Sequence, residues 1–300
     1  MDGEKVRVLV LLKPGEVQPA MERAAEFARF MPELEVVACR VIHEFDDLTK
    51  PSLEQQMSRE MLKIAQRYPS IKHFIPKIVF NKNVPEAFVQ EAKEGNYLFA
   101  IISANKRNTI KDLFISTIDC SIMRLISIPL LVVKDAHAPQ RLGRAILLCI
   151  DFEADDHEVL ADDKLFEAAT MFANNFNGEI HVANVVSPLH LGIRTRNTSM
   201  SPMFKSHGAT DGRADYHGDL LKEFADKHGI PDERTHVLIG RVDEEIPHLS
   251  HDIDARMVCM GMSPNNGLLG AMNSGASELV LEQIKGDLFI VNGIKMMEEE

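Results

Sequence analysis

Residues that support several common functions are scarce in this sequence. It contains no tryptophan and only 3 tyrosines, so it offers few aromatic side chains on which unpaired bases could stack. Its hydrophobic runs, such as Val8–Leu12 and Ile128–Val133, have the length of strands and fall well short of the ~20 residues that a membrane helix needs. The first residues, Met1–Lys5, lack the pattern of a secretion signal. These absences predict a cytoplasmic protein without a membrane partner.

Positive charge and cysteine are also in short supply. The 33 Lys and Arg residues are outnumbered by 45 Asp and Glu residues, which gives a net charge of -12. Such a surface repels nucleic-acid phosphates and anionic lipids, so no nucleic-acid partner is expected. The cysteines are far apart and form no CxxC pair, and three of them lie in apolar, strand-like runs. We predict reduced, largely buried thiols rather than disulfides or metal ligands at these positions: Cys39, Cys120, Cys149 and Cys259.

One structural unit occurs twice along the chain. A length of 300 residues allows two domains of ordinary size. In each half a buried-strand pattern is followed by a helical pattern, and the alternation continues to a fifth strand. The first strands are Lys5–Leu12 and Arg144–Ile150, and the last are Pro129–Lys134 and Asp287–Asn292. Apolar strands that alternate with helices predict parallel sheets covered by helices on both faces.

The two copies differ in length mainly at one place. The extra residues of the second copy fall in Ser187–Asp215, which is rich in Ser, Thr, Gly, Pro and Met and predicts a loop. Between the copies lies the polar stretch Asp135–Gly143, which predicts a linker. We therefore expect one unit over residues 1–138 and a second over residues 139–300.

The second unit carries the better candidate for a ligand site. In open parallel sheets, ligands bind beyond the carboxyl ends of the strands, where the strand order reverses. Asp151 follows the first strand of this unit, and its carboxylate could accept a hydrogen bond from a ribose hydroxyl or an adenine amine, or cap the turn. The loop Gly261–Glu278, rich in Gly, Ser and Asn, runs into a predicted helix over Ala276–Gln283. It could present amides to a phosphate, or be a plain flexible loop before a Ser-capped helix.

The first unit lacks these features. Its corresponding loop, Ser103–Asp119, contains no glycine, and Lys13 stands where the second unit has Asp151. The basic residues of that loop favour a solvated surface over an anion site. No nucleotide site is therefore expected in the first unit.

In this order, the features resemble the universal stress protein family. The resemblance covers nearly the whole chain and rests on four stretches: Thr117–Asp135, Tyr216–Ile230, Thr235–Pro247 and Gly261–Glu278. It implies an α/β fold of two tandem Rossmann-like units of the adenine nucleotide alpha hydrolase type, each with a five-stranded parallel sheet flanked by helices. It also implies that the fifth strands pair, so that the two units form a pseudo-dimer and no apolar edge is exposed. A further homodimer is left open.

The resemblance also implies ligand-binding residues. Members of the family that bind ATP use the glycines and hydroxyls of the loop for phosphate and ribose, and the ends of the first two strands for adenine. We transfer these positions to this sequence and add two glycines from within the loop. The candidate ligand-binding residues are then Asp151, Asn184, Val185, Gly261, Gly267, Gly270, Ser274, Gly275, Ala276 and Ser277. The chain departs from the pattern where Pro264 and Ser274 replace motif glycines, and Pro264 removes an amide donor. These departures predict weak binding of ATP with Mg.

No catalytic or metal-binding constellation is expected. The G-x-S-x-G motif of a nucleophile elbow is missing. The histidines, such as His217, His248 and His251, lack partners at zinc-type spacing and predict surface positions. The leading interpretation is a non-enzymatic bacterial stress-response protein with a nucleotide or anion pocket in its second unit. The alternatives are a slow ATPase switch, and a binder of lipid-like or apolar metabolites with a pocket formed partly by residues 188–215.

Overall fold

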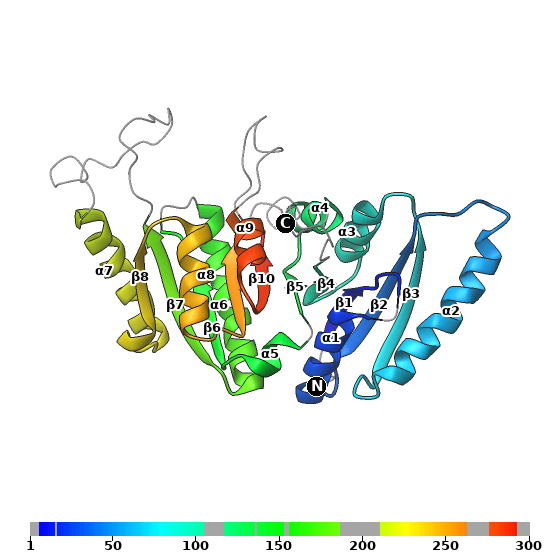
Figure 1. Cartoon of the computed structure of the whole chain (residues 1–300), viewed down its shortest axis with the longest axis horizontal. Helices are drawn as coiled ribbons and strands as arrows, with labels where there is room; N and C mark the ends of the chain where they lie inside the picture. Colours follow the sequence, from blue (N-terminus) through cyan, green and yellow to red (C-terminus); the bar gives the residue numbers. More distant parts are fainter. Residues whose placement is uncertain are drawn as a thin grey trace, which may run out of the picture.

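The computed structural model shows an α/β protein with one central sheet (Figure 1). It describes residues 6–15, 17–104, 117–135, 137–152, 156–186, 211–262 and 276–292. The elements of the first half are β1 (Arg7–Leu11), α1 (Pro19–Phe30), β2 (Glu35–Ile42), α2 (Lys50–Arg67), β3 (His73–Phe80), α3 (Val84–Glu94), β4 (Phe99–Ser103), α4 (Thr117–Leu125), β5 (Leu130–Val133) and α5 (Ala138–Arg141). Those of the second half are β6 (Ala145–Cys149), α6 (Asp156–Phe176), β7 (Glu179–Val186), α7 (Asp211–His228), η2 (Asp232–Arg234), β8 (Thr235–Ile239), α8 (Val242–Asp252), β9 (Met257–Gly261), α9 (Ala276–Gln283) and β10 (Asp287–Val291).

The strands form one continuous sheet of ten in the order β3-β2-β1-β4-β5-β10-β9-β6-β7-β8. Within each unit every pair is parallel, and the strand order reverses between β1 and β4 and between β6 and β9. The two units meet where β5 pairs antiparallel with β10, with Leu131 opposite Phe289. The predicted pairing of the fifth strands is confirmed, and this pairing covers the apolar edge that each unit would otherwise expose.

The hydrophobic core lies in two layers, one on each face of the sheet. Alternate residues of a strand point to opposite faces, so Val8 and Val10 enter one layer while Leu9 and Leu11 enter the other. Each layer contains buried residues of both units. The two halves of the chain therefore share their cores instead of meeting at a polar domain interface.

On one face, the junction of the units is built from aromatic rings and ion pairs. Phe27 of α1 stacks on Phe172 of α6 with ring centroids 5.5 Å apart. Beside this stack, Arg23 Nε donates a 2.6 Å hydrogen bond to Asp287 Oδ2 at the start of β10, and Glu26 accepts from both Arg23 and Arg256. These contacts tie α1 to the second unit.

Some helix starts differ from the sequence prediction. The helical patterns Asp163–Phe176 and Tyr216–His228 predict two helices of the second unit, but α6 begins at Asp156 and α7 at Asp211. Glycine and aspartate are poor helix formers, so intrinsic propensity hides the first turn of α7. The predicted linker Asp135–Gly143 contains the short helix α5. Residues 187–210 of the predicted loop lie outside the described residues, and the unit boundary at residues 138 and 139 stays a prediction.

The cysteines are free thiols, as predicted. Cys39 and Cys259 are buried, and Cys120 and Cys149 are half-buried. Burial raises the pKa of Cys39 to about 12 and that of Cys120 to about 11. At neutral pH these thiols are protonated, which makes them poor nucleophiles and poor metal ligands.

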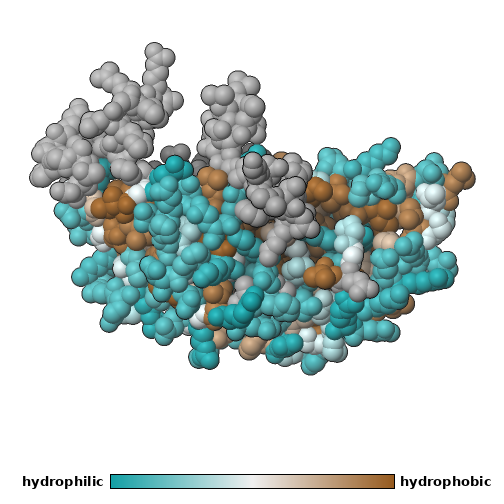
Figure 2. Space-filling view, viewed as in Figure 1, coloured by the Kyte–Doolittle hydropathy of each residue, from teal (hydrophilic) through white to brown (hydrophobic). Residues whose placement is uncertain are grey.

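The visible surface is largely hydrophilic. Figure 2 shows a face that is mostly hydrophilic, with hydrophobic residues in smaller patches between. Among the described residues, no helix is both long and apolar enough to cross a membrane.

Candidate functional site

The strand order places the candidate site at the carboxyl ends of β6, β7 and β9. The same backbone hydrogen bonds recur in both units, and they give the register between them. Leu12 N donates to Cys39 O at 2.8 Å, and Ile150 N donates to Ala183 O at 2.9 Å. Likewise, Ala104 N donates to Val133 O and Met262 N to Val291 O. The matched positions are therefore Lys13 and Asp151, Arg40 and Asn184, Ser103 and Gly261, and Asp119 and Ser277.

In the first unit, basic side chains link the strand ends to one another. Lys13 Nζ donates to the carbonyl oxygen of Ser103, and it lies 3.9 Å from Asp119 Oδ1. Arg40 Nη1 donates to the carbonyl oxygen of Leu12 at 3.2 Å. Burial lowers the pKa of Lys13, although Asp119 partly opposes that shift. These side chains of the first unit thus bond across its carboxyl edge, and the absence of a nucleotide site there stays a prediction.

In the second unit, Asn184 replaces the long arginine. Its side chain is only 1% exposed. Asn184 Nδ2 donates to the carbonyl oxygen of Ile150 at 2.8 Å, and Asn184 Oδ1 lies 2.8 Å from His217 Nδ1. The side-chain amide of Asn184 is therefore engaged inside the protein, and its predicted ligand role stays a prediction that only its backbone could fulfil. Val185, which follows it, is half-buried.

His217 of α7 is the residue that sequence reasoning missed. The prediction of a surface histidine is wrong here, because His217 is only 2% exposed. Since Asn184 Nδ2 donates to Ile150, its Oδ1 is the acceptor, and His217 Nδ1 carries the proton. The signal was in the helix period: Leu221 and Ala225, four and eight residues further on, are buried on the same face.

Burial shifts the pKa values of His217 and Asp151 at this edge of the sheet. Burial lowers the pKa of His217, with a smaller contribution from Arg213, and Asp151 partly opposes the shift. Asp151 keeps exposed surface, but desolvation by the surrounding protein raises the pKa of its carboxyl, an effect that His217 moderates. The site therefore presents a neutral imidazole beside a carboxyl group.

The third part of the site is the end of β9 and the start of α9. Gly261 closes β9, and among the described residues no atom lies within 4 Å of where its Cβ would be. Ser277 is buried in the first turn of α9, and Ala276 before it is exposed. Glu278 accepts two hydrogen bonds from Arg124 of α4, at 2.7 and 2.9 Å. The first unit thus holds the start of α9 in place.

The remaining predicted residues cannot be placed. Pro264, Gly267, Gly270, Ser274 and Gly275 lie outside the described residues. Over the part of the chain that is described, no group of three His, Cys, Asp or Glu side chains could hold a metal ion. Within the described residues, the arrangement offers a hydrogen-bond acceptor at Asp151, no atom within 4 Å of a Cβ at Gly261, and a helix start of the kind that binds anions.

Comparison with known proteins identifies the family. Residues 144–292 match the model of the universal stress protein family. The chain belongs to that family. Over 96% of its length, this universal stress protein is 24% identical to the universal stress protein E homolog of Haemophilus influenzae, of which the match also covers 96%.

Solved structures support the fold of this universal stress protein over its whole length. A protein of unknown function from Pseudomonas aeruginosa PAO1 superposes with a TM-score of 0.72 at 17% identity, over 98% of this chain and 95% of that one. A universal stress protein from Archaeoglobus fulgidus superposes with a TM-score of 0.67 at 16% identity, over 96% and 97%. At such identities the comparison shows the shared architecture alone.

Proposed function

We propose that this universal stress protein is a stress-response protein that binds an adenine nucleotide in its second unit and acts through that binding, without catalysis. The name of the Haemophilus relative supports the stress-response role. The family resemblance supports the class of ligand. The location rests on the difference between the two carboxyl edges.

The observation that carries the proposal is the pair of matched positions Ser103 and Gly261. In the first unit the Ser103 carbonyl accepts from Lys13, and Ser103 Oγ accepts from Ala20 N at the start of α1. In the second unit Gly261 has no side chain, and a Cβ there would meet no described atom within 4 Å. The glycine leaves room for a ligand beside Asp151, which supplies an acceptor for a ribose hydroxyl or a base amine.

The buried groups of the site favour binding over hydrolysis. Nucleotide hydrolysis needs a positioned water and a group that orients it. His217 is buried, and its Nδ1 is held by Asn184. Buried and held in this way, His217 is poorly placed to orient an attacking water, and Asp151 is assigned a hydrogen-bonding role toward the ligand.

Thermal unfolding of the full chain in the presence of Mg-ATP tests the proposal. A ligand present at a hundred times its Kd adds ~2.7 kcal/mol of stability, so the wild-type melting temperature should rise with nucleotide concentration. Gly261→Val should keep the melting temperature of the free protein, since the Cβ has room, and should abolish the nucleotide-dependent rise.

A control substitution introduces a valine outside the site. Ala65→Val, at a half-buried position of α2, should retain the full nucleotide-dependent rise. No rise in the wild type, or an equal rise in Gly261→Val, would contradict the proposed site. Phosphate release that scales with protein and is lost in Gly261→Val would contradict the non-catalytic role.

A further inference from the structure

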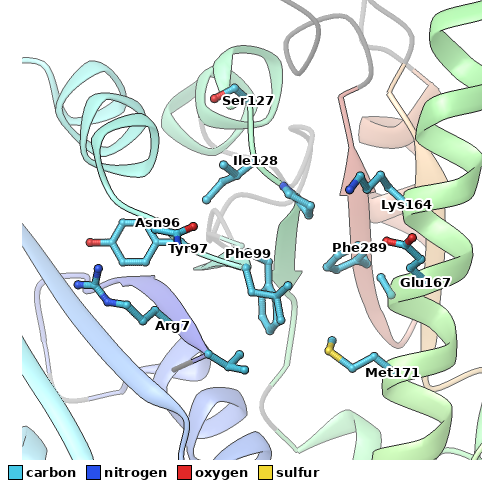
Figure 3. A pocket seen from close by; sticks show the side chains of 14 residues that line it. Arg7, Asn96, Tyr97, Phe99, Ser127, Ile128, Lys164, Glu167, Met171 and Phe289 are labelled. Atoms are coloured by element: carbon cyan, nitrogen blue, oxygen red, sulfur yellow. The ribbon is translucent and has the colours of Figure 1, made fainter. Parts of the chain in front are cut away.

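A cavity lies at the junction of the two units, away from the carboxyl ends of the strands of the second unit. Its volume is about 500 Å³, within the range of small-molecule sites. The first unit contributes the amino ends of β1 and β4 and the turn before β5, and the second unit contributes α6 and Phe289 of β10 (Figure 3). The site described above uses the opposite ends of the parallel strands, so the two sites are separate.

The walls of this cavity are amphiphilic. Phe99 and Phe289 are buried rings with centroids 6.0 Å apart at an interplanar angle of 76°, and Met171 lies beside them on α6. Arg7 on one side and Lys164 on the other bring positive charge, while Glu167 follows Lys164 along α6 (Figure 3). The cavity therefore combines an aromatic floor with cations on two walls.

Among the described residues, two buried polar atoms of the lining have no hydrogen-bond partner. They are Arg7 Nε and Ser127 Oγ, and Ser127 is only 5% exposed. The guanidinium of Arg7 lies 5.1 Å from the centre of the Tyr97 ring, with its Nε 3.4 Å from a Glu35 carboxylate oxygen. Arg7 is therefore paired with Glu35 already, whereas the buried Ser127 hydroxyl has no such partner among the described residues. A buried donor without an acceptor is costly, and an acceptor on a bound molecule would remove that cost at Ser127.

The two units are related by a pseudo-twofold axis, and the positions equivalent to the cavity lining carry different side chains. Phe172 of α6 is equivalent to Phe27 of α1. Counted back from these two rings, Ala168 corresponds to Arg23, and Met171 corresponds to Glu26. Matching backbone hydrogen bonds likewise relate Leu98 to Arg256.

On the related side, large charged side chains bond to one another. Arg23 bonds to Asp287 and to Glu26, and Glu26 also bonds to Arg256, which packs over the Phe176 ring. On the cavity side, Ala168, Met171 and Leu98 leave the corresponding volume open.

We propose that this cavity binds a small aromatic anion, with a flat apolar body and one acidic group. Phe99, Phe289 and Met171 suit the apolar body, because aromatic rings favour edge-to-face contact with other rings and thioether sulfur packs well on them. Arg7 and Lys164 suit the acidic group, since each can donate a charge-assisted hydrogen bond to it. A ligand here would contact both units.

The test uses 8-anilinonaphthalene-1-sulfonate as a probe of this class, added to the folded full chain. We expect one probe per chain by calorimetry and a rise in its fluorescence. Ala168→Phe fills the cavity and should weaken binding at least tenfold, and Arg7→Gln should weaken it several-fold. Ala65→Phe, the same change at a half-buried position of α2, should bind as the wild type does.

A second readout guards against misfolding of the filled variant. Because the chain has no tryptophan, Met171→Trp introduces a single reporter at the cavity wall. Probe bound there should quench that tryptophan by energy transfer, and should do so far less for Leu62→Trp on the exposed face of α2.

The outcomes separate this proposal from the nucleotide site. Gly261→Val should bind the probe normally, and Mg-ATP should not displace it. Absent binding, unchanged binding in Ala168→Phe, equal quenching of both tryptophans, or displacement by Mg-ATP would each overturn the second site.

Discussion

Single residues distinguish the carboxyl edges of the two units. Lys13 and Arg40 bond to the strand ends of the first unit. At the matched positions of the second unit, Asn184 bonds to Ile150, and no described atom lies within 4 Å of a Cβ at Gly261, which is why we propose the ligand site beside Asp151. The sequence predicted Asp151 and Gly261 because position after a parallel strand is readable from pattern. It did not predict the closure by Lys13, because that contact joins residues distant in the chain.

The Asp151 carboxylate should contribute strongly to nucleotide affinity. Asp151→Ala removes the acceptor for a ribose or base donor, and hydrogen bonds to charged groups contribute about 1.5–3 kcal/mol. We expect the Kd for Mg-ATP, measured by calorimetry, to rise roughly ten- to a hundredfold. Asp232→Ala, at an exposed position of η2, serves as the control and should leave the Kd unchanged. A wild-type Kd in Asp151→Ala would remove this residue from the site.

The buried pair of Arg23 and Asp287 should be the costliest ion pair to break. Both side chains are at most 2% exposed, so Arg23→Met leaves a buried carboxylate without its main partner. The expected loss is about 3–5 kcal/mol, measured by urea unfolding. Arg234→Met breaks a more exposed pair with Glu179 and should cost at most about 1 kcal/mol. Similar losses in the two variants would contradict the importance of burial.

At the scale of elements, strands were easier to predict than helix starts or helix faces. The runs Glu35–Ile42, His73–Phe80 and Glu179–Val186 predict strands, and β2, β3 and β7 have these bounds, because the runs end sharply in polar turns. The start of α7 was missed because Gly212 and Asp215 resemble loop residues. The burial of His217 followed from the face that α7 turns to the sheet, which the sequence only hints at.

Strands β7 and β8 are joined by a histidine pair that should make stability depend on pH. His181 Nδ1 and His236 Nε2 are 3.0 Å apart with nearly parallel rings, so one proton lies between them. Burial lowers the pKa of both, and His236 adds to the effect on His181. In the unfolded chain these groups take up protons near pH 6.5, before the folded pair does. The free energy of unfolding should therefore fall as pH drops from about 7 to 5.

Replacing one member tests this dependence. His236→Gln removes one depressed group and the repulsion on the other, so the loss of stability between pH 7 and 5 should be smaller than in the wild type. His248→Gln removes an exposed histidine of α8 and provides the matched control. A steeper loss in His236→Gln, measured by urea unfolding across this range, would contradict the assignment.

At the scale of the whole molecule, the two units share one sheet and one hydrophobic core. Strand β5 pairs with β10, and both hydrophobic layers cross the junction. The pairing of the units could be predicted because a short apolar fifth strand needs a partner. The asymmetry of the junction could not, since it depends on which side chains meet across the pseudo-twofold axis.

A fragment of residues 1–138 tests this unity. Expressed alone, it exposes the edge of β5 and half of each core layer, so it should self-associate or aggregate. Size-exclusion chromatography with light scattering measures this, with the full chain as reference. A soluble, folded monomer would contradict the shared core.

We infer that the two units have diverged, so that one closes its own carboxyl edge and the other keeps a ligand site. Equilibrium dialysis of the full chain with labelled ATP and Mg tests it most directly, by counting the nucleotides bound at saturation. We predict one nucleotide per chain in the wild type and none in Gly261→Val. Two nucleotides per chain, or one that persists in Gly261→Val, would contradict the account.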